Sequence, residues 1–235
     1  MCPSGTNYGR VMDPNLREQV LRQVRSEIIS GQSGPGKMYS VPTLAADLGM
    51  STTPVREALL ELARTGLIEP MRNRGFKVVE PTADDLRNLF DMRSLLEVHA
   101  AELFALKPRK KKKLIEQLTG LADAIGTAVE NDDLYGYLES DRNFHMAFID
   151  AAENALLTEM TMGLRDKMRL HGISSRAGLE RQAASVGEHY QLIALAEASN
   201  VDGIRELMRN HILTWEPIFM EALLKSRREM NGTRA

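Results

Sequence analysis

The later part of the sequence contains four side chains whose types suit a divalent transition metal. Asp141 and His145 are four residues apart, so they share one face if that segment is helical. His189 and His211 follow later in the chain. Three imidazoles and one carboxylate are suitable ligands for zinc, nickel or manganese. The spacing alone is weak evidence, because a histidine on an amphipathic helix is more often a surface or core residue.

A second set of residues, near the N-terminus, has the types and placement needed to contact DNA. A helix fits the major groove, where its first residues meet base edges and its free N–H groups meet phosphate. Arginines in a turn beside a glycine can approach the DNA backbone closely. Four candidates start a predicted helix and three lie in a predicted turn: Ser51, Thr52, Thr53, Arg56, Arg72, Arg74 and Gly75.

The elements that must position this second set follow from local patterns. Residues 15–29 carry apolar side chains at helical spacing, and the glycine-rich run 31–36 ends that helix. A short helix over 42–48 precedes a longer one, for which Ser51 is the expected N-cap and Gly66 the terminator. Two extended runs, 67–71 and 76–80, flank a turn at 72–75. We therefore predict a winged helix-turn-helix over residues 14–80, after a disordered start over 1–13.

Beyond Pro81 and Thr82, the expected linker, the pattern is helical up to residue 227. We predict helices over 83–106, 109–130, 132–151, 154–171, 178–198 and 201–227. No strand is expected there, so residues 83–228 are predicted to form an all-α helical bundle, followed by a tail over 229–235. The fold class is mainly α, with an N-terminal winged helix-turn-helix and a C-terminal bundle.

Composition limits the class of protein and its compartment. The chain has 235 residues, of which 43% are hydrophobic and 26% charged, as in ordinary globular proteins. No apolar run approaches the roughly 18 residues of a membrane span, and the N-terminus lacks the apolar core of a signal peptide. The single cysteine, Cys2, rules out an internal disulfide. We expect a cytoplasmic protein with no membrane association.

The N-terminal motifs resemble those of the GntR family of bacterial regulators. The matching runs are Ser51-Thr52-Thr53-Pro54-Val55-Arg56-Glu57-Ala58-Leu59, then Gly66-Leu67-Ile68, then Arg74-Gly75-Phe76-Lys77-Val78. The resemblance covers nearly all of residues 14–80 and implies a homodimer that binds a short palindromic operator. Two positions depart from the family: Thr52 and Pro42 stand where arginine is usual. These departures put the usual operator half-site in doubt, but not the DNA-binding role.

The C-terminal region resembles the FCD effector domain of the FadR-type subgroup. The resemblance rests on the run Asp141-Arg142-Asn143-Phe144-His145, on Glu188-His189 and on Met208-Arg209-Asn210-His211. It implies that the Asp and His positions are metal ligands and that a small organic acid binds against the metal. Arg93 has two interpretations: it faces the cavity and pairs with the carboxylate of the effector, or it forms a surface ion pair with Glu97.

Together these observations predict a transcription regulator, a repressor rather than an enzyme, that releases operator DNA when a carboxylate effector binds. Effector binding is expected to shift helices of the C-terminal domain, and the linker at Pro81 and Thr82 to transmit that shift. One alternative is a metal-dependent enzyme, since a metal held by histidines can activate water. Another is a regulator whose metal only stabilises the fold.

Overall fold

The computed structural model describes residues 14–79, 81–107, 111–168 and 172–232, which form two compact units. The N-terminal unit contains residues 14–27 and 34–79, and the C-terminal unit contains residues 28–33 and the described chain from residue 81 onward. The start over 1–13, predicted to be disordered, lies outside the described residues. Among the described helices, none is long and apolar enough to cross a lipid bilayer.

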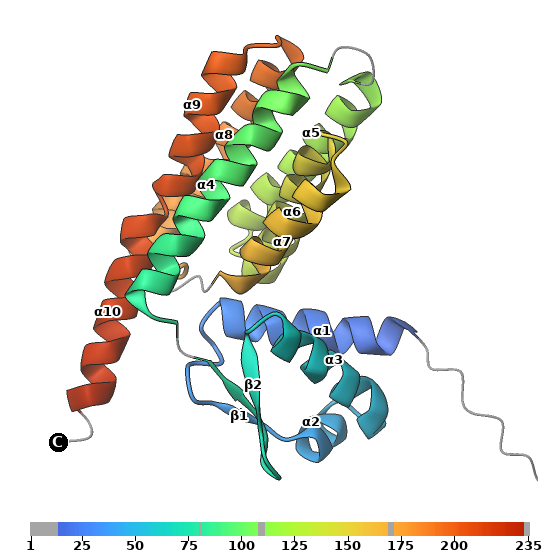
Figure 1. Ribbon diagram of the computed structural model, residues 1–235, viewed down its shortest axis with the longest axis vertical. Helices are drawn as coiled ribbons and strands as arrows, with labels where there is room; N and C mark the ends of the chain where they lie inside the picture. Colours follow the sequence, from blue (N-terminus) through green and yellow to red (C-terminus); the bar gives the residue numbers. More distant parts are fainter. Residues whose placement is uncertain (1–13, 80, 108–110, 169–171, 233–235) are drawn as a thin grey trace, which may run out of the picture. The chain divides into compact units, whose positions relative to one another are not determined.

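The N-terminal unit combines three helices with a small antiparallel sheet (Figure 1). The order along the chain is α1 (Pro14–Ile29), β1 (Met38–Tyr39), α2 (Val41–Asp47), α3 (Thr52–Arg64), β2 (Ile68–Met71) and β3 (Gly75–Val78). The strands lie in the order β1-β3-β2. Strand β1 was not predicted, because two residues are too few to show an alternating pattern.

Helix α3 is held against the unit by one apolar face, which leaves Thr52, Thr53 and Arg56 near its start exposed. Val55, Ala58, Leu59 and Leu62 are fully buried. Ser51 occupies the N-cap position as predicted, but its side chain makes no capping hydrogen bond, so the predicted role of its hydroxyl is wrong. Gly66 adopts a φ of 78° and ends the helix, as its position predicts.

The packing of the β2–β3 hairpin requires glycine at position 75, whether or not the hairpin contacts DNA. Gly75 has a φ of 100°, and a Cβ atom there would lie 2.2 Å from the carbonyl oxygen of Tyr39. Strand β1 therefore packs against β3 too closely for any side chain at this position. Asn73, the middle residue of the turn, has a φ of 58° and gives the hairpin its tight reversal.

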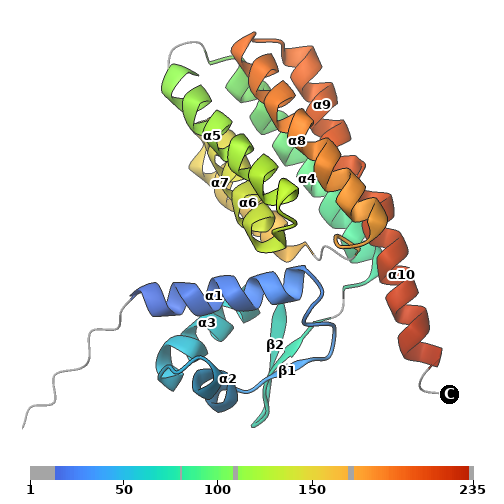
Figure 2. The same cartoon turned by 180° about the vertical axis from the view of Figure 1, so that it is seen from behind.

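The C-terminal unit is a bundle of helices (Figures 1 and 2). Its core is rich in phenylalanine. The largest fully buried side chains of this unit include five phenylalanines: Phe90, Phe104, Phe144, Phe148 and Phe219. Its helices are α4 (Ala83–Ala105), α5 (Lys111–Glu130), α6 (Leu134–Asp150), α7 (Ala155–Lys167), α8 (Arg176–Glu197), α9 (Val201–Leu213) and α10 (Glu216–Gly232).

The segment 201–227, predicted as one helix, is two helices with a break at Thr214 and Trp215. Pro217 is the physical reason: it has no backbone N–H to donate to the carbonyl of Leu213, and its ring disfavours a continuous helix. The prediction of a tail from residue 229 is also wrong up to Gly232, because α10 continues to that residue.

Three helix-to-helix turns of this unit share one construction. Asp132, Glu153 and Ser199 each adopt a left-handed conformation, with φ values of 53°, 56° and 55°. The next residue in each turn is the N-cap of the following helix, and its side chain accepts a backbone N–H. These caps are Asp133, Asn154 and Asn200. The turns coincide with three of the predicted helix breaks.

Candidate metal centre and DNA-contacting surface

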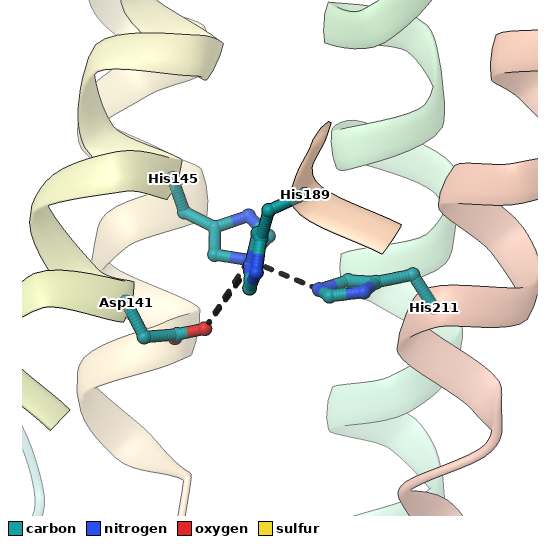
Figure 3. Close-up of side chains that lie close together, drawn as sticks. All are labelled: Asp141, His145, His189 and His211. Atoms are coloured by element: carbon teal, nitrogen blue, oxygen red, sulfur yellow. Dashed lines mark hydrogen bonds and ion pairs between the residues drawn. The ribbon is translucent and has the colours of Figure 1, made fainter. Parts of the chain in front are cut away.

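Three helices bring the four predicted ligands together in the interior of the bundle (Figure 3). Helix α6 carries Asp141 and His145 on one face, α8 carries His189, and α9 carries His211. One ligand atom from each residue lies within 4.8 Å of all the others. The three histidines are buried and Asp141 is partly buried. Residues 70 positions apart therefore converge because the bundle packs their helices side by side.

The separations between the donor atoms suit a small metal ion. The Nε2 atom of His145 lies 3.2 Å from Nε2 of His211 and 3.4 Å from Nε2 of His189. Oδ1 of Asp141 lies 3.6 Å from Nε2 of His145 and 3.5 Å from Nε2 of His189. Four ligands at tetrahedral positions around zinc, with bonds of about 2.0–2.1 Å, would be separated by about 3.4 Å. The donor set and its spacing thus fit a divalent transition metal.

The protonation states of these groups also favour metal binding. Burial, followed by the charge of Arg165, holds the pKa of His145 well below its usual value. Burial likewise lowers the pKa of His211 to about 4, although Glu188 opposes this shift. Burial alone would raise the pKa of Asp141, but the neighbouring imidazoles and Arg165, which donates to its Oδ2 atom, outweigh burial and hold that pKa well below its usual value. Neutral imidazoles and an ionised carboxylate are the forms that bind metals.

Hydrogen bonds around the cluster orient its ligands. Nδ1 of His211 lies 2.6 Å from Oε2 of Glu188, so this ring nitrogen donates and Nε2 keeps its lone pair for the cluster. Nδ1 of His145 lies 3.6 Å from Oε2 of Glu97. Within the described chain, Nδ1 of His145 and Nδ1 of His189 are buried without a hydrogen-bond partner. The ring of Phe144 packs edge-on against His189, with 4.5 Å between centroids.

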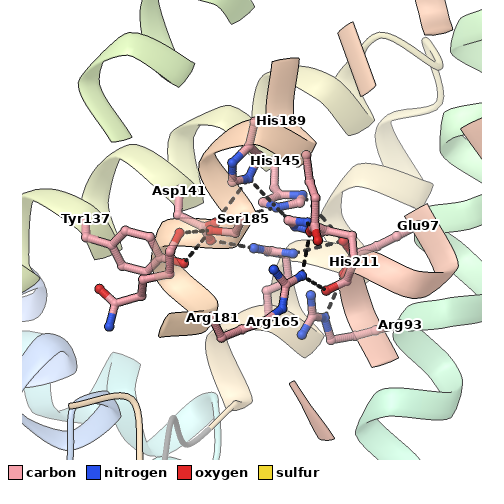
Figure 4. A network of polar contacts seen from close by, with 12 residues as sticks. Arg93, Glu97, Tyr137, Asp141, His145, Arg165, Arg181, Ser185, His189 and His211 are labelled. Atoms are coloured by element: carbon pink, nitrogen blue, oxygen red, sulfur yellow. Dashed lines mark hydrogen bonds and ion pairs between the residues drawn. The ribbon is translucent and has the colours of Figure 1, made fainter. Parts of the chain in front are cut away.

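Below the cluster, arginines and carboxylates form a buried network (Figure 4). Arg165 donates to Oδ2 of Asp141 at 2.7 Å and to Oε2 of Glu97 at 2.9 Å. Nε of Arg93 donates to Oε1 of Glu97 at 2.7 Å. Arg93 and Glu97 thus form an i, i+4 pair, but the interpretation of this pair as a surface ion pair is wrong, because both side chains are buried. Arg165 fixes the orientation of Asp141, one of the four candidate ligands.

A third arginine, Arg181, lies on the other side of the network. It donates to Oε2 of Glu188 at 2.5 Å, the same oxygen that accepts from His211. Partial burial would raise the pKa of Glu188, but its bonds from His211 and Arg181 outweigh that effect and lower the pKa to about 2. The sequence analysis missed Arg165 and Arg181. A signal existed for Arg181, since Ser185 and His189 follow it at successive i+4 steps on one face of α8.

The predicted DNA-contacting side chains lie on the surface of the N-terminal unit. Ser51, Thr52, Thr53 and Arg56 are exposed at the start of α3, and Arg72 and Arg74 are exposed in the β2–β3 turn. Arg56, Arg72 and Arg74 form no ion pair within the described part of the chain. Arg64, further along α3, instead pairs with Glu61 at 2.5 Å. Three cations of this unit are therefore available to an external anion.

Comparison with protein families identifies the chain. The family model described as "Bacterial regulatory proteins, gntR family" matches residues 16–78, and the model of the FCD domain matches residues 88–214. This chain belongs to the GntR family and carries an FCD domain. It is therefore a transcription regulator, and its helix-turn-helix domain implies binding to DNA. The resemblance inferred from the sequence motifs and the predicted fold class are both confirmed.

Relatives of this GntR regulator match it over most of their length. It is 30% identical over 207 residues to the "Probable D-xylose utilization operon transcriptional repressor" of Paenarthrobacter nicotinovorans, covering 86% of this chain and 89% of that protein. It is 27% identical over 210 residues to the regulator McbR of Escherichia coli (strain K12), covering 87% and 94%. The solved structure of E. coli McbR/YncC superimposes with a TM-score of 0.72 at 26% identity, covering 85% and 96%.

Proposed function

We propose that this GntR regulator is a repressor whose affinity for operator DNA is controlled by a small organic acid bound beside a divalent transition metal. Asp141, His145, His189 and His211 would hold the metal, which is zinc, nickel or manganese. The observation that carries the proposal is the convergence of these four donors within 4.8 Å of one another, with three of them buried and four of the six pairs 3.2–3.6 Å apart. A bound ion would offer an open coordination position to a carboxylate.

The charge of the site supports an acidic effector. Arg93, Arg165 and Arg181 balance Glu97, Asp141 and Glu188 in formal charge, and lowered pKa values keep His145 and His211 neutral. A divalent ion would therefore leave the site with two uncompensated positive charges, which favours an anionic ligand. Arg93 donates to Glu97 through Nε, and its terminal nitrogens have no hydrogen-bond partner among the described residues. These nitrogens could fork onto a carboxylate, as the first interpretation of Arg93 proposes.

The exposed start of α3 is the proposed reading element for DNA. Ser51, Thr52, Thr53 and Arg56 would face base edges and phosphates in the major groove, while Arg72 and Arg74 would contact the adjacent backbone. The proposed role of Gly75 is limited to setting the backbone path of the hairpin. Its close approach to Tyr39 already requires glycine at this position. A homodimer would present two such helices to a palindromic operator.

Metal analysis of untagged protein, on wild type and His145→Ala together, tests the proposal first. We expect about one transition-metal ion per wild-type chain and loss of that ion in the variant. The metal-loaded protein is then screened against small carboxylates for release of bound operator DNA. A wild-type protein that contains no metal and takes up neither zinc, nickel nor manganese would contradict the metal centre and leave only the DNA-binding regulator.

A further inference from the structure

Arg181 connects the candidate metal centre to the break between α9 and α10. Its Nη2 atom donates to Oε2 of Glu188 at 2.5 Å and to the backbone carbonyl of His211 at 3.1 Å. Its Nε atom donates to Oγ1 of Thr214 at 2.8 Å. The guanidinium carbon lies 5.4 Å from the centroid of the Trp215 ring. One side chain therefore contacts both the proposed ligand His211 and the two residues at the break.

The break itself creates the acceptor that Arg181 uses. In a continuous helix, the carbonyl of His211 would accept the N–H of Trp215. Here the N–H of Trp215 bonds to the carbonyl of Ile212 at 3.3 Å, and Pro217 has no N–H to offer to this turn. Arg181 supplies a donor to the His211 carbonyl in place of the backbone. The conformation of the break is thus tied to the position of Arg181.

Metal binding by His211 would act directly on the hydrogen bonds that Arg181 makes. His211 and Arg181 donate to the same oxygen atom of Glu188. A metal ion on Nε2 of His211 would make its Nδ1–H a stronger donor and restrict the ring. Glu188 and Arg181 must then adjust together, because the lone pairs of one carboxylate oxygen are shared between two charged or polarised donors. Thr214 and Trp215 follow, since both contact Arg181.

A chain of contacts continues from the break to the linker. The Trp215 and Phe219 rings are stacked with 5.1 Å between centroids, and Phe219 lies 6.1 Å from the ring of Phe90 in α4. Further along α10, Arg227 donates to the backbone carbonyl of Pro81 at 3.2 Å. Pro81 lies just before α4, in the segment that joins the two units. Helix α10 therefore contacts both the first half of α4 and the linker.

We propose that Arg181 is the coupling residue of this regulator: it transmits occupancy of the His211 side of the metal centre to the α9–α10 break, and α10 passes the change to the linker through Arg227. This inference rests on the proposed metal centre and deepens it. In this proposal, the last turn of α9 and the start of α10 together switch between two hydrogen-bonded arrangements. The metal centre and the linker both shift the balance between these two arrangements.

Trp215 is the only tryptophan in the chain, so its fluorescence reports on the break alone. Zinc is the probe, because its filled d shell gives it no redox chemistry of its own. Full-length protein is titrated with zinc while bound zinc is measured by equilibrium dialysis. We expect the emission of Trp215, or its quenching by acrylamide, to change with the same midpoint as zinc binding. Zinc binding without any change at Trp215 overturns the coupling proposal. If zinc does not bind, the titration is repeated with nickel and manganese, and uptake of none of the three overturns the metal centre and, with it, the coupling.

Arg181→Met removes the proposed link, and Arg176→Met is its matched control on the same helix. Arg176 is exposed and pairs only with Glu180 within the described chain. We expect Arg181→Met to bind zinc with unchanged stoichiometry, and its zinc-induced change at Trp215 to be at least about five-fold smaller than in the wild type. We expect Arg176→Met to retain the wild-type change at Trp215. An unchanged response in Arg181→Met contradicts the proposal. The melting temperature of each variant shows whether it has folded.

Arg227→Met keeps the proposal testable if Arg181→Met does not fold. This change leaves the residues of the centre and of the break in place and removes the bond of Arg227 to the carbonyl of Pro81. Hydrogen exchange of the backbone amides is measured with and without zinc. We expect zinc to slow exchange over residues 81–90 and in α10 in the wild type, and to slow it only in α10 in Arg227→Met, with the Trp215 response retained. Equal protection of residues 81–90 in both proteins contradicts the last step of the coupling.

Discussion

The two units of this regulator use arginine in opposite ways. In the N-terminal unit, Arg56, Arg72 and Arg74 are exposed and form no ion pair within the described chain. In the C-terminal unit, Arg93, Arg165 and Arg181 are largely buried, and each is bonded to a carboxylate. Exposed cations without internal partners contribute little to stability and remain available to phosphate. Buried, paired cations hold other side chains in place, so their loss disturbs the fold and the site.

The largest expected effect is at Arg165. Arg165→Met would leave Glu97 and Asp141 without their shared cation in a buried position, which costs about 3–5 kcal/mol in the free energy of unfolding. Urea denaturation measures it. The matched change in the other unit, Arg74→Met, is expected to alter stability by no more than about 0.5 kcal/mol. Similar effects of the two substitutions would contradict the contrast between the units.

Removing a proposed ligand should strongly weaken metal binding while leaving the proposed DNA-contacting surface intact. We expect His145→Ala to weaken zinc binding by more than about 100-fold, beyond the range seen for residues that only orient a ligand. Competition with a zinc chelator of known affinity measures this loss. Binding of the metal-free variant to duplex DNA should match that of metal-free wild type. Retention of wild-type zinc affinity would exclude His145 from the site.

A smaller effect is expected where a side chain orients a ligand. Glu188→Gln keeps the size of the side chain but weakens the acceptor for Nδ1 of His211. We expect zinc affinity to fall by about 10–100-fold, with one ion still bound at saturation. The same chelator competition applies, with Glu180→Gln as an exposed control on the same helix. A Glu188→Gln protein that binds zinc as the control does would show that this hydrogen bond has no role in metal binding.

The smallest effects are expected at single arginines of the proposed DNA-contacting surface. Arg72→Ala and Arg74→Ala should each weaken binding to duplex DNA of mixed sequence and lower the slope of log affinity against log salt by about 1. Thermal unfolding should be unchanged. Lys77→Ala provides a comparison, because Lys77 already pairs with Glu69 at 2.6 Å. An unchanged salt slope in both turn variants would mean that the hairpin does not contact phosphate.

The order of elements was predictable because each signal was local. The glycine at position 66 and the breaks at 153 and 199 lie where the sequence analysis placed them, and the break at 132 falls at the predicted start of a helix. Strand β1 could not be found, since its two residues gain their pairing from β3, far along the chain. The break before α10 carried a local signal in Pro217, but the strong apolar period on both sides obscured it.

The site was predictable in its residue types but not in its geometry. Residue types and family resemblance singled out Asp141, His145, His189 and His211, and the structure brings all four together. Their supporting residues depend on tertiary packing. Arg165 is 24 positions from Asp141 and 68 positions from Glu97 in the sequence, and it bonds to both. The residue spacing of a helix or a strand does not predict contacts over such separations. A buried arginine is detectable in sequence only as a polar residue on an apolar face, and that pattern does not name its partner.

The left-handed residues in three turns of the bundle have a consequence for engineering. Asp132, Glu153 and Ser199 hold a conformation that costs a residue with a Cβ atom about 1 kcal/mol or more relative to glycine. The adjacent caps already fix each reversal, so glycine at these positions would keep the turn and remove the strain. Glycine also increases the conformational entropy of the unfolded chain, so each substitution sets the relief of backbone strain against that cost. The melting temperatures of single glycine variants would show how much of the stability of the bundle depends on the backbone conformation of its turns.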